Sequence, residues 1–119
     1  RIAVASITLV TLAAVAGCGS GNPSYGGAPG CTASTAAATS QVAIQNLSFA
    51  PACIKVPAGT TVPFTNADGV THTVTADDGA YNSGNLAPAQ VYTHLYPAPG
   101  SSAYHCTIHA GMTGTVVVQ

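Results

Sequence analysis

The segment YHCTIHAGM, residues 104–112, determines both a local fold and a set of chemical groups. It contains Cys106, His109 and Met112, and this methionine is the only one in 119 residues. A Pro-Gly pair at 99–100 precedes the segment, and an Ala-Gly pair follows its second histidine. These turn residues predict a strand–loop–strand hairpin. Its loop returns the methionine beside the cysteine, with the histidine at the tip.

A thiolate, an imidazole and a thioether that converge from one hairpin form most of a metal site. His72, at the start of the run HTVTA, is the natural candidate for a second imidazole. Two histidines and one cysteine in a plane, with a weak axial methionine, are the ligands of a blue-copper electron-transfer centre. Zinc prefers four firm ligands, and a thioether serves it poorly. The sequence therefore predicts one type 1 copper ion held by His72, Cys106, His109 and Met112.

The two other histidines are not predicted as ligands. Side chains alternate along a strand, so His105 points away from the face that carries Cys106. His94 is predicted to be a solvated strand position, and Tyr104 to pack in the core beside the site.

From Gln41 onward, short alternating apolar runs are separated by Gly, Pro, Asn and Asp. This pattern is typical of an all-β sandwich, and no segment carries the apolar stripe of a helix. Pro63 cannot donate to a strand ladder, so we expect an edge or a bulge there. The predicted strands begin near residue 42 and continue at residues 53–56, 60–66, 72–76, 90–96, 102–106 and 113–118.

The segments VPAGTTVPFTNADGVTHTVTADDG (56–79) and YHCTIHAGMTGTVVV (104–118) resemble plastocyanin/azurin-type cupredoxins. The short Cys-x2-His-x2-Met loop resembles that of amicyanin. The resemblance covers about residues 41–119. It implies a Greek-key β-sandwich of about seven or eight strands, with copper at one end inside an apolar patch.

Carried over by motif position, the family's ligands are the same four residues. Thr73 stands where many relatives have Asn, a residue that helps to tie the ligand loops together. The Thr73 hydroxyl can form part of the same link between the loops. Ile108 replaces a common Pro, which predicts a less rigid loop.

Residues 1–17 resemble a bacterial lipoprotein signal, with one Arg, an apolar run and small residues before Cys18. The resemblance implies cleavage before Cys18 and lipid attachment to its sulfur. An ordinary signal peptide or an uncleaved anchor is the alternative. Each alternative predicts export to the cell envelope, and lipidation adds a membrane anchor on the extracytoplasmic side.

Residues 18–40 are rich in Gly, Ser, Ala and Thr and predict a flexible linker before a domain at 41–119. Export favours a disulfide between Cys31 and Cys53. The alternative is two unpaired thiols.

Charged residues make up only 4% of the chain, so nucleic acid is not an expected partner. Docking to redox partner proteins would rely on shape and apolar contact. We expect an electron carrier and not an enzyme, because a second, catalytic copper would need several more histidines. Copper capture or delivery without electron transfer is the alternative.

Overall fold

The computed structural model describes residues 27–119, which form eight strands and no helix. No helix in this part of the chain has the length and apolar character needed to cross a membrane. The strands are β1 (Val42–Gln45), β2 (Ser48–Ala50), β3 (Cys53–Val56), β4 (Thr60–Asn66), β5 (Thr75–Ala76), β6 (Val91–Tyr96), β7 (Gly100–His105) and β8 (Thr113–Val118).

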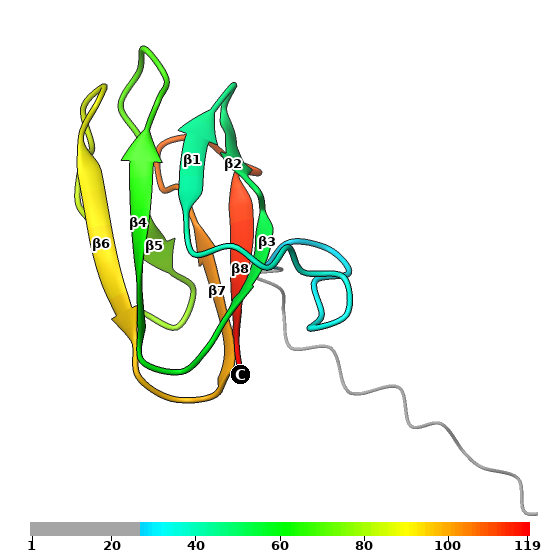
Figure 1. Ribbon diagram of the computed structural model, residues 1–119. Helices are drawn as coiled ribbons and strands as arrows, with labels where there is room; N and C mark the ends of the chain where they lie inside the picture. The colour runs from blue at the N-terminus through cyan, green and yellow to red at the C-terminus, as the bar shows by residue number, and fades with distance from the viewer. Residues whose placement is uncertain (1–26) are drawn as a thin grey trace, which may run out of the picture.

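The strands form two four-stranded sheets that pack face to face (Figure 1). The first sheet has the order β2-β1-β4-β6 and the second has the order β3-β8-β7-β5. β1 pairs parallel with β4 and β3 pairs parallel with β8, whereas the other pairs are antiparallel. The predicted all-β sandwich of seven to eight strands is confirmed.

The core lies between the sheets because alternate residues of each strand face inward. In β4, Val62 and Phe64 are fully buried, while Pro63 between them is only partly buried. Tyr104 is also fully buried and meets Phe49 and Phe64 edge-on, at ring centroid distances of 4.7 and 5.2 Å. Its predicted packing role is confirmed. Gly114 lies directly against the Tyr104 ring, where a Cβ atom would have no room.

Pro63 lies within β4, which has a neighbour on each side. The amide of Asn66 donates to the carbonyl of Gln90, so the even-numbered residues of β4 make the hydrogen bonds to β6. Pro63 therefore faces the β1 side, and β1 begins only opposite Phe64. The predicted edge or bulge at Pro63 is therefore wrong, because β4 is an interior strand with an unbroken ladder to β6. Proline is accommodated there because its missing N–H points to a place where β1 has not yet begun.

Residues 27–40 pack against the second sheet, unlike the flexible linker expected for them. Cys31 and Cys53 form the predicted disulfide. The Ala28 amide donates to Thr115 Oγ1 at 3.0 Å, and Ala37 bridges to Ile54 beside β3. The loop-entropy relation gives such a crosslink a stabilisation of about 3 kcal/mol. The predicted signal sequence and Cys18 lie outside the described residues.

Candidate metal centre

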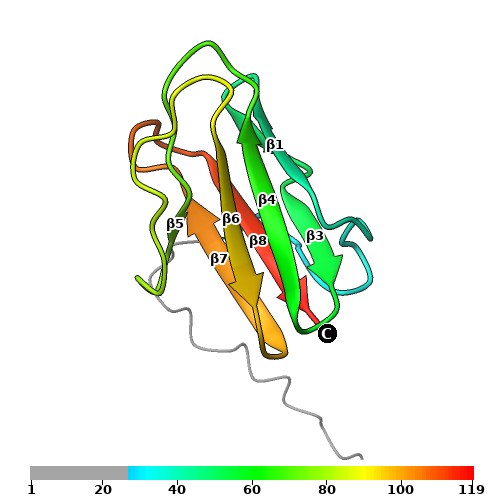
Figure 2. The same cartoon turned by 60° about the vertical axis from the view of Figure 1, so that its left-hand side comes forward.

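The predicted ligands come together at one end of the sandwich. The loop that leaves β4 carries His72, and the loop between β7 and β8 carries Cys106, His109 and Met112. In Figures 1 and 2 this β7–β8 loop, drawn in orange, lies at the end of the molecule opposite the C-terminus. The Cys106 amide donates to the Met112 carbonyl at 3.0 Å, which closes the predicted hairpin.

His72, Cys106 and His109 offer ligand atoms that all lie within 4.8 Å of one another. The Cys106 Sγ atom is 3.8 Å from Nδ1 of His72 and 3.8 Å from Nδ1 of His109. Two bonds of about 2.3 and 2.05 Å that meet at about 120° place sulfur and nitrogen about 3.8 Å apart. The sulfur and the two nitrogens are therefore close enough to bind a single ion together. Met112 lies in the same loop with its side chain buried, and it remains the predicted fourth ligand.

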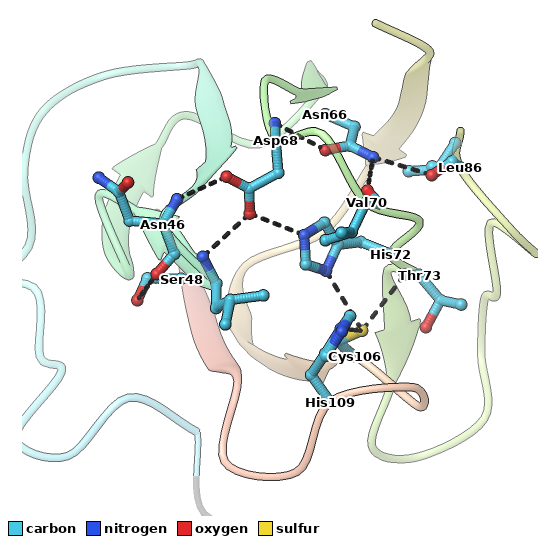
Figure 3. A network of polar contacts seen from close by, with 11 residues as sticks. Asn46, Ser48, Asn66, Asp68, Val70, His72, Thr73, Leu86, Cys106 and His109 are labelled. Atoms are coloured by element: carbon cyan, nitrogen blue, oxygen red, sulfur yellow. Dashed lines mark hydrogen bonds and ion pairs between the residues drawn. The ribbon is translucent and has the colours of Figure 1, made fainter. Parts of the chain in front are cut away.

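A carboxylate fixes the orientation of the His72 ring (Figure 3). His72 Nε2 lies 2.8 Å from Asp68 Oδ2. Donation from Nε2–H to this carboxylate leaves the lone pair on Nδ1, which faces the Cys106 sulfur. The ring is completely buried, so this partner sets both its tautomer and its position.

Asp68 is itself held by the turn between β1 and β2. Its carboxylate accepts from the amides of Asn46 at 2.7 Å and Leu47 at 2.9 Å. The Leu47 amide, the His72 ring and the Asn46 amide outweigh burial and keep the pKa of Asp68 below its ordinary value. Asp68 was not among the functional residues predicted from the sequence. The available signal in the sequence was an acidic residue four positions before His72. The loop is irregular, so no periodicity indicated that the two side chains would meet.

Asn66 connects the same loop to the rest of the fold. It is completely buried, and its side-chain amide donates to the carbonyls of Val70 at 2.8 Å and Leu86 at 2.9 Å. Its oxygen accepts from the Asp68 amide at 3.0 Å. All three bonds are satisfied without solvent, so the loop that carries His72 is fixed before any metal binds.

Thr73 links the two ligand loops, as expected for its position. Its amide lies 3.4 Å from the Cys106 sulfur, and its hydroxyl accepts from the Thr107 amide at 2.9 Å. The hydroxyl also contacts the side chains of Thr75 and Thr107, each at 3.1 Å.

The surroundings of the Cys106 thiol favour its ionised form. Burial opposes ionisation, but the amides of Thr73 and His109 and the imidazoles of His109 and His72 together lower the pKa of Cys106 to about 6. A thiolate is the form that binds metal. At neutral pH the folded chain therefore presents a charged sulfur between two imidazoles.

In the metal-free protein, we expect the 240 nm thiolate absorbance of Cys106 to titrate near pH 6, against about 8.5 in denaturant. The folded state binds the Cys106 proton more weakly than the unfolded chain does. The ionised thiol therefore stabilises the folded state fully at pH values above the pKa of Cys106 in the unfolded chain. This stabilisation is lost as pH falls through the folded pKa. Subtracting the spectrum of Cys106→Ser isolates this thiol from tyrosine. A folded-state midpoint at or above 8 would contradict the hydrogen-bond pattern.

The other two histidines lie away from the three donors. His105 Nδ1 pairs with Asp77 Oδ1 at 2.6 Å, in agreement with its predicted direction. His94 is only partly solvated, because one side of its ring packs 3.9 Å from that of Tyr81. Burial there lowers the pKa of His94.

Comparison with known proteins agrees with this geometry. Residues 5–118 match the family described as the cupredoxin-like domain. The chain belongs to the cupredoxin family. As in other cupredoxins, its cofactor is one copper ion, and the His72, Cys106 and His109 cluster is the candidate site.

This cupredoxin is similar in sequence to a plastocyanin and to an amicyanin. It is 34% identical over 86 residues to the chloroplastic plastocyanin of Tetradesmus obliquus, covering 61% of this chain and 59% of that protein. It is 31% identical over 88 residues to amicyanin-alpha of Methylorubrum extorquens, covering 70% of this chain and 74% of that protein. The chain thus spans about three fifths of the length of the plastocyanin.

A solved Cu-containing nitrite reductase from Thermus scotoductus SA-01 shares the fold, with a TM-score of 0.62 and 27% sequence identity. That match covers 66% of this cupredoxin but only 22% of the reductase chain.

Proposed function

We propose that this cupredoxin is a type 1 copper electron carrier that cycles between Cu(I) and Cu(II). The observation that carries the proposal is the close approach of Cys106 Sγ to Nδ1 of His72 and of His109. His72, Cys106 and His109 would hold the copper, and Met112 is the proposed fourth ligand. When bound, copper supplies a one-electron couple.

The protein's part in electron transfer is to keep the ligands still. Asp68 holds the His72 ring, and the Thr73 hydroxyl holds the chain beside Cys106. Both are hydrogen bonds within a packed sandwich, so the ligands need little movement when the ion changes charge. Small rearrangement favours rapid transfer.

The surface around the site suits apolar docking. His72 is fully buried, whereas His109 is partly exposed and is the ligand nearest to a partner. Leu47, Val70 and Ile108 form what we call the apolar rim, with exposures of 52%, 46% and 48%. Each lies in a loop of the metal end, since Leu47 contacts Asp68, Val70 contacts Asn66 and Ile108 adjoins His109. We propose that unidentified donor and acceptor proteins bind there.

Electron self-exchange in a mixture of reduced and oxidised protein tests this proposal. Ile108→Glu places like charges across the encounter surface and is expected to slow exchange at least tenfold. Ser101→Glu makes the same charge change in an exposed strand position away from the rim and should leave the rate nearly unchanged. NMR line broadening gives both rates.

Copper delivery without electron transfer is the alternative function. It predicts slow self-exchange in the parent protein and rapid loss of copper to a chelator, and that pair of results would replace our proposal. We propose a carrier rather than an enzyme because the two histidines beyond the ligand set, His94 and His105, are engaged by Tyr81 and Asp77.

We also propose that the protein is exported and held at the membrane by lipid on Cys18. The support is the signal-like sequence of residues 1–17 together with the Cys31–Cys53 disulfide, which suits an oxidising compartment. The mass of the mature N-terminal peptide tests this. An unmodified peptide that retains residues before Cys18 would contradict it.

A further inference from the structure

The strand β6 is the last strand of the first sheet. Within residues 27–119 it pairs only with β4, and the sheet order places no strand on its other side. Tyr81, from the segment before β6, contacts the inward-facing rings of the strand. Figures 1 and 2 show β6 at the outer margin of its sheet. An uncovered edge presents unpaired N–H and C=O groups to any strand that can approach.

The direction of these groups follows from the pairing with β4. The Asn66–Gln90 hydrogen bond and the register with β4 assign Tyr92, His94 and Tyr96 to the positions that bond to β4. The amide and carbonyl groups of the intervening residues, Val91, Thr93 and Leu95, therefore point to the free edge. The side chains of the same three residues lie on the outer face of the sheet, and all three are exposed.

This edge lacks the features that usually prevent strand pairing. Natural edges are protected by charged residues, proline or a bulge. β6 has no charged residue and no proline, and its register with β4 is continuous from Val91 to Tyr96. Instead, Val91 and Leu95 are exposed by 53% and 51%. An irregularity at Ala89 and Gln90, which both bond to Asn66, and Pro97 lie just outside the strand. Within Val91–Tyr96, neither a like charge nor a local distortion would oppose the approach of an identical strand.

The sequence of the edge is complementary to itself. When β6 pairs antiparallel with a second β6 about Thr93, each Val91 lies opposite Leu95 of the other copy. The outward-pointing backbone groups of Val91, Thr93 and Leu95 then meet their counterparts in hydrogen-bonded pairs. Both apolar side chains leave water through a cross-strand contact on the same face. We propose that this cupredoxin forms a two-fold symmetric homodimer through β6, which joins two four-stranded sheets into one.

This arrangement leaves the metal centres free. β6 begins at the metal end, since Gln90 bonds to Asn66 beside the His72 loop. Two antiparallel copies of β6 therefore point their metal ends in opposite directions. Each apolar rim stays open to a redox partner, and the dimer does not depend on the proposed electron-transfer role.

Sedimentation equilibrium of the copper-loaded protein, in a density-matched detergent that accommodates its apolar N-terminal segment or its lipid, tests the dimer. We expect a concentration-dependent monomer–dimer equilibrium in the parent protein. Thr93→Lys places two like charges directly opposite one another and should raise the dimer dissociation constant at least tenfold. Gln45→Lys, an exposed position of β1 two strands from the edge, makes the same charge change and should leave the constant within twofold. A parent protein that is monomeric up to about 1 mM, or a dimer unaffected by Thr93→Lys, would overturn the proposal.

Cysteine crosslinking tests the register independently. In Thr93→Cys the two introduced residues lie directly opposite, with Cα atoms about 5.5 Å apart, which a disulfide can span. In Val91→Cys they are four residues out of register, about 14 Å apart, which it cannot span. We expect a disulfide-linked dimer on a non-reducing gel for Thr93→Cys and at least tenfold less for Val91→Cys. Equal crosslinking of the two variants, or none in either, would reject this pairing.

Discussion

Gly114→Ala is expected to destabilise the folded protein by about 3 kcal/mol, because overpacking a rigid core costs about 1–3 kcal/mol and sometimes more. The added Cβ atom would lie 2.6 Å from Cε2 of Tyr104 and would also overlap Cζ and the hydroxyl. The ring cannot move aside easily, since Phe49 and Phe64 contact it edge-on. Urea unfolding of the metal-free protein measures the change.

Gly69→Ala is the matched control for this substitution. Gly69 has open space around the position of a Cβ atom, and its backbone does not have a positive φ. The same chemical change there should alter the free energy of unfolding by less than about 0.5 kcal/mol. Similar losses in the two variants would mean that the Tyr104 contact does not constrain Gly114.

The second large effect concerns the carboxylate that holds His72. In Asp68→Asn an amide oxygen can still accept from Nε2–H, but the negative charge and its electron donation to the ring are lost. Changes of such outer partners typically weaken metal binding by about 10–100-fold. The loss of affinity should be greater for Cu(II) than for Cu(I), because Cu(II) carries the higher charge. A tenfold selective loss raises a one-electron reduction potential by about 59 mV, and spectroelectrochemical titration would detect it.

Asp77→Asn provides the comparison. Asp77 also pairs with a histidine, but His105 is outside the ligand set. The substitution removes the same charge and should raise the potential by less than half as much. Equal shifts would assign the effect to overall charge, and an unchanged potential in Asp68→Asn would show that the carboxylate does not tune the ion.

The sequence allowed the three clustered ligands and every strand except β2 to be predicted, because both depend on short-range rules. The strand expected at residues 72–76 is shorter, since only Thr75–Ala76 form β5. Alternation identified β4 and its buried Phe64, and the turn residues around His109 determined the hairpin that closes on Cys106. The disulfide was predictable from export and from the number of cysteines. The alternation and the turn residues can each be recognised within a few positions, and the disulfide follows from the number of cysteines.

The remaining features depend on contacts between distant segments. Asp68 reaches His72 through an irregular loop whose shape is set by the amides of Asn46 and Leu47, and no sequence pattern encodes that meeting. Residues 27–40 looked like a linker because they have little to bury, yet backbone bonds and Cys31 attach them to the second sheet. The packing of His94 on Tyr81 joins a strand to a distant loop.

The central claim is a single copper ion bound by the sulfur of Cys106 between two imidazoles. The optical spectrum of the oxidised, copper-loaded protein tests it most directly, with Cys106→Ser measured beside it under identical copper loading. We expect an intense blue thiolate-to-copper band in the parent protein and its complete loss in the variant. A parent protein without that band, or a variant as blue as the parent, would contradict the site described above.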